Sequence, residues 1–228
     1  MSKLYFRYAA MNAGKSTALL QVAHNYEERG MRVLLFTAAH DDRAGAGLIG
    51  SRLGLTRPAA TFGADTEFSA AALHAMLGSG AREARSQSPA TTPTGLPPAG
   101  AAFSPQALAC LLIDEAQFLT PAQVRQLHRI AHVDGLPVIC WGLRGDFRGE
   151  AFPGSAALLT LADDLEEMKT ICACARKATM NIRIDAQGRR VQQGEQVVIG
   201  GNERYRAVCP GCFYSDEAGG PPAPGLFG

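Results

Sequence analysis

Residues 4–16 read LYFRYAAMNAGKS, and this stretch decides the fold of a chain of 228 residues. Residues 4–9 have the apolar character of a short buried strand, and residues 16–29 carry apolar side chains at helical spacing. A phosphate-binding loop needs this order of strand, loop and helix around a Gly-Lys-Ser end. The stretch therefore predicts a nucleotide-binding protein.

The loop spans residues 9–16 and departs from the usual GxxxxGK[ST] pattern at its first glycine, which is Ala9 here. Backbone amides of such a loop surround phosphates, and the following helix N-terminus adds partial positive charge. We expect Lys15 to reach the phosphates of ATP and the Ser16 hydroxyl to ligate Mg²⁺. The alternative is a chance Gly-Lys-Ser in an ordinary loop. The expected ATP-binding residues in this segment are Ala9, Ala10, Met11, Asn12, Ala13, Gly14, Lys15 and Ser16.

A second half of the same site is predicted at residues 110–115, which read CLLIDE. An apolar strand that ends in an acid suits Mg²⁺, so we expect Asp114 to hold the ion directly or through water. The neighbouring Glu115 could take a proton from an attacking hydroxyl. Acids at strand ends are common singly, but the two motifs together are much less expected by chance.

The sequence also predicts two further strands and one helix. Residues 32–37 (RVLLFT) and 137–141 (PVICW) are unalternated apolar runs, typical of a parallel sheet covered on both faces. Thr120, Pro121 and Gln123 form a capping box with proline at the first helical position. The succession predicts an α/β fold, a parallel sheet of the P-loop NTPase type flanked by helices.

The character of the chain changes after Met168. Short β-type runs (MKTICAC, TMNIRI, EQVVIG and YRAVC) are separated by turns and carry four of the six cysteines. Four thiolates complete a tetrahedral zinc site, and a small unit with little core needs such a staple. The alternative is two thiol pairs without metal. The expected structural zinc ligands are Cys172, Cys174, Cys209 and Cys212, whereas Cys110 and Cys140 are expected in the core.

Composition excludes several classes of protein. Lys and Arg total 22 and Asp and Glu total 21, so the net charge is +1. This near-neutral net charge argues against a protein that binds nucleic acid mainly through an overall positive charge. No apolar run approaches the ~18 residues of a membrane span. Six cysteines without a signal peptide suit a reducing compartment, so a cytoplasmic protein is expected.

Three weaker signals have ordinary explanations. His128 and His132 are four residues apart on the expected helix, but no third metal ligand is evident, so a solvated face is expected. The acidic run at residues 163–167 is expected to be a solvated helix end. Residues 41–43 (DDR) could support magnesium or phosphate binding, or could form a polar loop.

Together these motifs resemble one family, the zinc-containing, tetrameric thymidine kinases of bacteria and animal cytosol. The matching segments read AMNAGKST, TAAHDDR, LLIDEAQFLT, GLRGDFRGEAF and VVIGGNERY. The resemblance implies transfer of the γ-phosphoryl group of ATP to the 5′-hydroxyl of thymidine, with Glu115 as the proton acceptor. It also extends the ATP site to Asp114, Glu115, Ala116 and Gln117.

The resemblance further implies a nucleoside site, a homotetramer and feedback inhibition by dTTP. Phe147 would stack on thymine, and a zinc-tied lasso loop would close over the nucleoside. The implied lasso residues are Gln196, Val197, Val198, Ile199, Gly200 and Tyr205.

The expected organisation is a P-loop domain over residues 1–167 and a zinc-ribbon and lasso domain over residues 168–214. A disordered tail is expected at residues 215–228. Residues 86–100 carry four prolines, have no counterpart in the family, and are expected to form a flexible insertion.

Two alternative functions remain open from the sequence. One is a P-loop ATPase whose zinc ribbon binds DNA, although near-neutral charge weighs against it. The other is a nucleotide-binding regulator without catalytic activity, which Ala9 or the insertion could produce.

Overall fold

The structure is a computed structural model that describes residues 2–41, 43–84, 108–196 and 204–215. The largest sheet in these residues has six strands, all parallel, in the order β5-β2-β6-β7-β1-β8. This confirms the predicted parallel α/β sheet. The strands are β1 (Leu4–Ala9), β2 (Arg32–Ala38), β5 (Ala60–Phe62), β6 (Leu108–Ile113), β7 (Val138–Leu143) and β8 (Asp164–Glu167).

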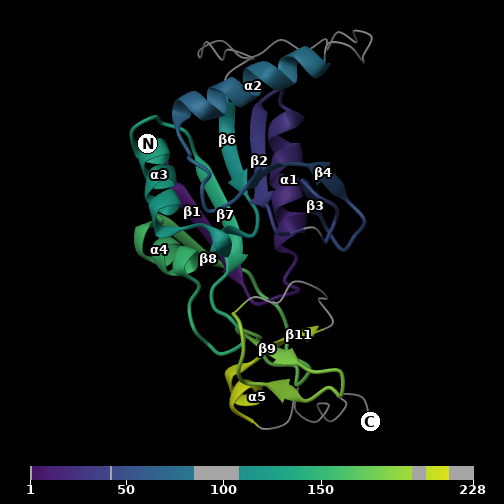
Figure 1. The fold of residues 1–228 in the computed structure, drawn as a ribbon. Helices are drawn as coiled ribbons and strands as arrows, with labels where there is room; N and C mark the ends of the chain where they lie inside the picture. Colours follow the sequence, from purple (N-terminus) through teal and green to yellow (C-terminus); the bar gives the residue numbers. More distant parts are fainter. Residues whose placement is uncertain (1, 42, 85–107, 197–203, 216–228) are drawn as a thin grey trace.

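Helices cover both faces of this sheet, with α1 on one side and α3 and α4 on the other (Figure 1). Along β6, Leu111 and Ile113 pack in the core cluster that includes α3 and α4, whereas Cys110 and Leu112 pack in the cluster that includes α1. Both faces of the strand are therefore apolar, which explains the unalternated sequence. The helical segments are α1 (Lys15–Glu27), α2 (Ala70–Ala84), the 3₁₀ turn η1 (Ala116–Phe118), α3 (Pro121–His132) and α4 (Pro153–Leu161).

The capping box at the start of α3 is confirmed. The amide of Gln123 donates to the Thr120 hydroxyl at 3.2 Å, and the Thr120 amide donates to Gln123 Oε1 at 2.9 Å. Pro121 occupies the first helical position, as predicted. This cap fixes where α3 begins, so that Val124 and Leu127 face the core without exposed surface.

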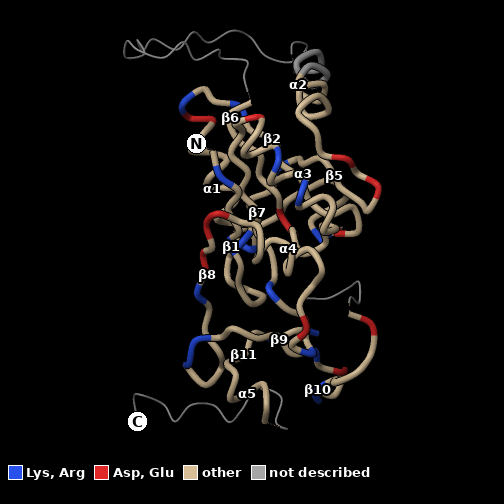
Figure 2. Tube along the Cα trace, turned by 90° about the vertical axis from the view of Figure 1, so that its left-hand side faces the viewer, with Lys and Arg blue, Asp and Glu red and all other residues tan. Residues whose placement is uncertain are grey.

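The expectation of a solvated helix end at residues 163–167 is wrong. Helix α4 ends at Leu161, and residues 164–167 of the run form β8, which pairs with β1 at the edge of the sheet. An edge strand exposes its side chains to water, so charge is tolerated there. Glu166 also makes an ion pair with Arg7 of β1 at 3.0 Å. In Figure 2 the acidic residues of β8 mark this edge in red.

A second, smaller sheet follows the parallel one and lies below it in Figure 1. In the described part of the chain it is antiparallel, in the order β10-β9-β11, and packs on a small core of its own. The runs TMNIRI and YRAVC are confirmed as strands. The elements are β9 (Met180–Ile184), β10 (Arg190–Val191), β11 (Tyr205–Val208) and helix α5 (Pro210–Tyr214).

The expectation of a strand at residues 168–174 is wrong, because the chain turns there. The amide of Cys172 donates to the Arg176 carbonyl at 2.8 Å, and Ala175 adopts a left-handed φ of 63°. The turn places the thiols of Cys172 and Cys174 on the same side of the chain, where they lie in one cluster. A further hairpin, β3 (Leu48–Gly50) with β4 (Thr56–Pro58), lies between β2 and β5 in sequence.

Several expectations lie outside the described residues: the insertion at 86–100, residues 197–200 of EQVVIG, and the tail from residue 216 onward. Among the helices of the described part, none is both long enough and apolar enough to cross a membrane.

Candidate active site

The phosphate-loop segment lies between the end of β1 and the start of α1. Gly14 precedes the helix with φ 77°, a conformation that is strained for any residue with a side chain. Asn12 adopts a second left-handed φ of 65°. Within the described residues no side chain caps α1, so its first amide groups are directed at the loop interior, where an anion would bind.

Lys15 is curled into this loop. Its ammonium group donates to the carbonyl oxygen of Ala10 at 3.2 Å, and the residue is 8% exposed. Burial lowers the pKa of Lys15, whereas the carboxylates of Glu115 and Asp114 act in the opposite direction. The lysine is therefore held beside two acids, in the place where it could reach a bound phosphate.

The structure brings Ser16 and Asp114 together from segments 98 residues apart. The Ser16 hydroxyl donates to Asp114 Oδ2 at 2.7 Å. Burial raises the pKa of Asp114 to about 7, and the neighbouring Glu115 carboxylate adds to this rise. A buried carboxylate that lacks a full counter-charge favours a cation, and these oxygen donors fit Mg²⁺.

Glu115 begins the 3₁₀ turn in a left-handed conformation, with φ 52°. Its carboxylate accepts hydrogen bonds from the Arg43 guanidinium and, at 2.5 Å, from Gln117 Nε2. Arg43 also pairs with Asp41 at 2.5 Å, and this hydrogen bond raises the pKa of Arg43 above its ordinary value. Backbone strain of this kind clusters at functional sites, where it fixes one side-chain direction.

The sequence left open whether residues 41–43 support magnesium or phosphate binding or form a polar loop. The structure places the Arg43 guanidinium, a permanent cation, on the Glu115 carboxylate. Asp42 lies outside the described residues. The contact was not foreseeable from sequence, because it joins residues 72 positions apart.

Two further residues of the expected ATP site are buried. Ala116 lies in the core cluster beside α3 and α4. Gln117 donates to Glu115 and accepts from the amide of Leu143 at 3.0 Å. Gly142 allows this approach, because a Cβ atom there would lie 2.9 Å from Gln117 Oε1. Gln117 therefore holds the Glu115 carboxylate against the end of β7.

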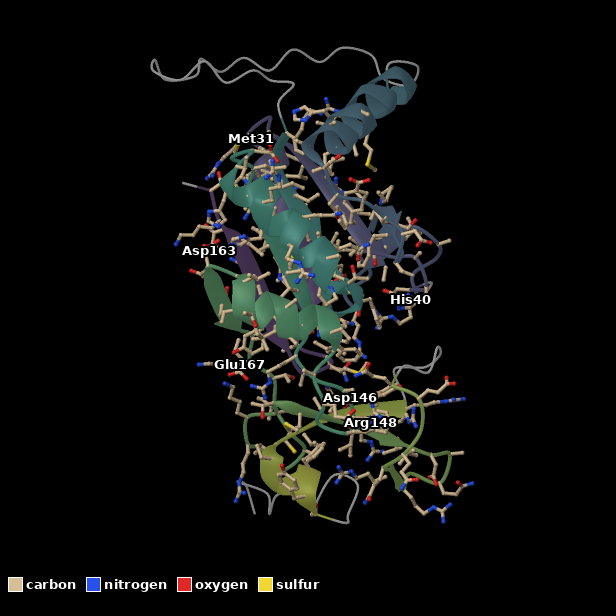
Figure 3. The ribbon with its side chains drawn as sticks, turned by 60° about the vertical axis from the view of Figure 1, so that its left-hand side comes forward. Met31, His40, Asp146, Arg148, Asp163 and Glu167 are labelled. Carbon is tan, nitrogen blue, oxygen red and sulfur yellow. The ribbon has the colours of Figure 1, made fainter. Side chains whose placement is uncertain are left out.

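The loop after β7 is organised by Asp146. Its Oδ1 atom accepts from the amides of Arg148 at 2.8 Å and Glu150 at 2.9 Å, and its Oδ2 atom accepts from Gln196 Nε2 at 3.2 Å. Phe147 is only 1% exposed, and the Arg183 guanidinium lies 3.9 Å from its ring centre. One face of the Phe147 ring is thus covered by arginine. Figure 3 shows Asp146 and Arg148 where this loop meets the small sheet.

Strand β9 supplies two functional candidates that sequence reasoning missed. Asn181 accepts from the amide of Met11 at 2.8 Å and donates to the Gly145 carbonyl at 3.1 Å. Arg183 donates to the carbonyl oxygens of Glu195 at 3.0 Å and Gln193 at 2.8 Å. The alternation of polar Asn181 and Arg183 with two isoleucines was the available signal, because it places both on one face.

The residues expected in the lasso are described only in part. Gln196 reaches Asp146, and Tyr205 stands opposite Arg183 in the pairing of β11 with β9. Val197, Val198, Ile199 and Gly200 lie outside the described residues. The two ends of the segment therefore meet at Arg183 and Asp146, next to Phe147.

The four predicted zinc-ligand cysteines form one cluster. The Sγ atoms of Cys172, Cys174, Cys209 and Cys212 all lie within 4.8 Å of one another, and Cys174 and Cys209 are 3.5 Å apart. The amide of Cys212 lowers the pKa of the Cys209 thiol to about 7, which favours the thiolate that zinc binds. Four sulfur ligands with this convergence fit a structural zinc site. Cys110 and Cys140 are fully buried in the sheet, as expected.

Comparison with known proteins agrees with this geometry. The thymidine kinase family model matches residues 2–76 and 94–213. A thymidine kinase of Albidiferax ferrireducens is 56% identical over 219 residues, which cover 96% of this chain and 95% of that protein. One of Chromobacterium violaceum is 52% identical over 216 residues, which cover 95% and 100%. One of Idiomarina loihiensis is 51% identical over 209 residues, which cover 92% and 94%. The chain belongs to the thymidine kinase family.

Proposed function

We propose that this chain transfers the γ-phosphoryl group of ATP to the 5′-hydroxyl of thymidine and so forms dTMP. The observation that carries the proposal is the meeting of Lys15, the Ser16–Asp114 pair and Glu115 at one end of the parallel sheet. Membership of the thymidine kinase family supports thymidine as the acceptor. Phosphoryl transfer needs positioning and charge neutralisation, which this set of residues can supply.

In this proposal the loop amides of residues 9–16 and the Lys15 ammonium hold the phosphates of ATP. Mg²⁺, when bound, offsets the negative charge of the phosphates, and Ser16 and Asp114 are the residues that would hold it. The 5′-oxygen of thymidine forms a bond to the γ-phosphorus as the bond to ADP breaks. Glu115 takes the proton that the hydroxyl loses, and Arg43 and Gln117 keep its carboxylate in place.

The nucleoside site is proposed at Phe147, Gln196, Tyr205 and residues 197–200. The Arg183 and Arg148 guanidinium groups lie over the Phe147 ring, 3.9 and 5.8 Å from its centre, and the residue is 1% exposed, so stacking of thymine on Phe147 requires a neighbouring side chain to move. Closure of the 197–200 segment would exclude water, which would otherwise compete with thymidine for the phosphoryl group. Arg183 and Asp146 anchor the base of that segment.

Arg183→Lys is expected to raise the KM for thymidine on the order of 10- to 100-fold and to leave the KM for ATP near that of the parent. Lysine cannot donate to two carbonyl oxygens as a planar fork, and it stacks less well on an aromatic ring. A hydrogen bond from a charged group contributes about 1.5–3 kcal/mol, and 1.4 kcal/mol is about tenfold in affinity. Steady-state kinetics with each substrate varied in turn measures the two KM values.

The control for this variant is Arg189→Lys. Arg189 lies in the same small unit, is 76% exposed in its side chain and pairs with Asp185. It should behave as the parent. A thymidine KM that stays unchanged in Arg183→Lys, or both KM values rising together with a lower melting temperature, would count against a positioning role.

Structural zinc at the four cysteines, a homotetrameric state, feedback inhibition by dTTP and a cytoplasmic location belong to the same proposal. The thiol cluster supports zinc, since its four sulfur atoms converge within 4.8 Å of one another. We further propose a two-part organisation, with residues 1–167 binding ATP and residues 168–214 carrying zinc and the lasso. The separate core clusters of the two sheets support this division.

The test of the proposed function is a panel of acceptors. The purified protein is incubated with ATP, Mg²⁺ and each of the four deoxynucleosides or deoxyuridine, and monophosphates are separated. We expect phosphorylation of thymidine but not of the purine nucleosides. ADP release without any nucleoside monophosphate, together with salt-sensitive retardation of DNA, would instead favour the ATPase with a DNA-binding zinc ribbon.

A further inference from the structure

A second cluster of metal-ligating side chains lies at the C-terminal end of α3. His128 and His132 are one helical turn apart, and Asp163 lies in the link between α4 and β8. The ligand atoms of the three side chains all lie within 4.8 Å of one another. Asp163 is therefore a potential third ligand that the sequence did not reveal. This carboxylate comes from 31 residues beyond His132, where no sequence spacing could reveal it.

The arrangement has the geometry of a helical metal site. Two histidines at positions i and i+4 project from one helix face, as they do in metal-binding helices. The rings of His128 and His132 are 4.5 Å apart between centroids, and His132 Nε2 is 2.9 Å from Asp163 Oδ2. Ligands about 2.0–2.1 Å from zinc lie about 3.4 Å apart in a tetrahedral site. Small rotations of partly exposed side chains would bring all three to that spacing.

The carboxylate is held in place before any ion binds. Asp163 Oδ2 accepts from the amide of Leu4 at 2.8 Å, and the amide of Asp163 donates to the Leu4 carbonyl at 2.9 Å. The side chains of His132 and Asp163 are 33% and 26% exposed, so an ion can reach them from solvent. Figure 3 shows Asp163 at the edge of the molecule, well separated from Asp146 and Arg148 of the active site.

We propose that His128, His132 and Asp163 bind one divalent transition-metal ion, for which Zn²⁺ is the best match. Two imidazole nitrogens and one carboxylate oxygen suit zinc, and water would complete the tetrahedron. Such an ion would tie the end of α3 to the first residue of β1, the strand that leads into the phosphate loop. A simple His132–Asp163 ion pair is the competing explanation, and it needs no contribution from His128. The inference does not depend on the proposed kinase activity.

The test uses tag-free protein whose cysteine cluster already holds zinc, shown by elemental analysis to contain one zinc per chain. Isothermal titration with Zn²⁺ should then show one further equivalent per chain. Zinc at a hundredfold excess over the dissociation constant should raise the melting temperature by roughly 5–10 °C. His128→Gln and Asp163→Asn should each weaken this binding at least tenfold. Asparagine retains an oxygen that can accept from Leu4, so folding should be preserved.

The matched control is His24→Ala. His24 is exposed and pairs with Glu28 one turn away at 3.2 Å, but in the described structure it belongs to no cluster of three potential metal ligands. This variant should bind the second zinc as the parent does. The proposal is overturned if the parent binds no second equivalent. It is equally overturned if the second equivalent persists in His128→Gln and Asp163→Asn, because the ion would then lie elsewhere.

Discussion

Glu115→Gln is expected to lower kcat for thymidine phosphorylation by about 10²–10⁴-fold while ATP binding stays close to that of the parent. Glutamine has the shape of glutamate but cannot accept the proton of the attacking hydroxyl. Arg43 retains its pair with Asp41, so the loop that carries it should stay in place. Single-turnover rates and a separate ATP titration measure the two quantities.

The control for Glu115→Gln is Glu28→Gln, which removes an exposed carboxylate 63% open to solvent. It should leave kcat unchanged. A Glu115→Gln protein that forms dTMP at the parent rate would contradict the assignment of Glu115 as the general base. An equal loss of ATP binding would instead make Glu115 a residue that organises the phosphate site.

Cys209→Ser is expected to abolish zinc binding and to lower kcat/KM for thymidine on the order of 10²-fold or more. Cys209 is 2% exposed and lies 3.5 Å from the Cys174 sulfur, within a core too small to be stable without a staple. Asn181 and Arg183 lie on the sheet that this staple supports, and displacement of positioning residues by about 1 Å can cost 10²-fold in rate. Elemental analysis and steady-state kinetics are the measurements.

Cys110→Ala provides the comparison for the zinc prediction. Its thiol is also buried, and burial raises its pKa to about 12, but it lies in the parallel sheet and outside the cysteine cluster. This variant should keep its zinc and most of its activity. A metal-free parent protein with an intact fold and full activity would contradict the structural role of zinc.

The sequence predicts those parts of the molecule whose signals are local. The loop at residues 9–16 stands between a strand and a helix, and the capping box of Thr120 and Gln123 spans a single turn. Short edge strands escape this reasoning. β8 has only four residues and mostly acidic side chains, and it is a strand because β1 offers free backbone groups at the sheet edge.

The long-range contacts of the site could not be predicted in the same way. Arg43 meets Glu115, Asn181 meets Met11 and Asp163 meets His132 only after the chain folds back on itself. Pattern and propensity report on neighbours within a few residues, whereas these partners are chosen by the order of strands in the sheet. The Cys-Ala-Cys segment shows the same limit. Its β-type composition predicts a strand, but the chain turns there and both thiols lie in the cysteine cluster.

Strand β9 gives the small sheet a direct connection to the phosphate loop. One face carries Ile182 and Ile184 into the core of the small unit, while Asn181 and Arg183 on the other face contact Met11, Gly145 and the 193–195 backbone. The cysteine cluster supports the same unit. We therefore propose that zinc binding and substrate positioning are linked through this strand.

The most direct test of the central claim is the stoichiometry of products formed from ATP and thymidine in the presence of Mg²⁺. The purified protein is sampled over time, and ADP and phosphorylated thymidine are separated and identified. We expect one molecule of 5′-dTMP for each ADP, and little ADP when thymidine is omitted. ADP formed without dTMP, or phosphate placed on the 3′-oxygen, would contradict the proposed reaction.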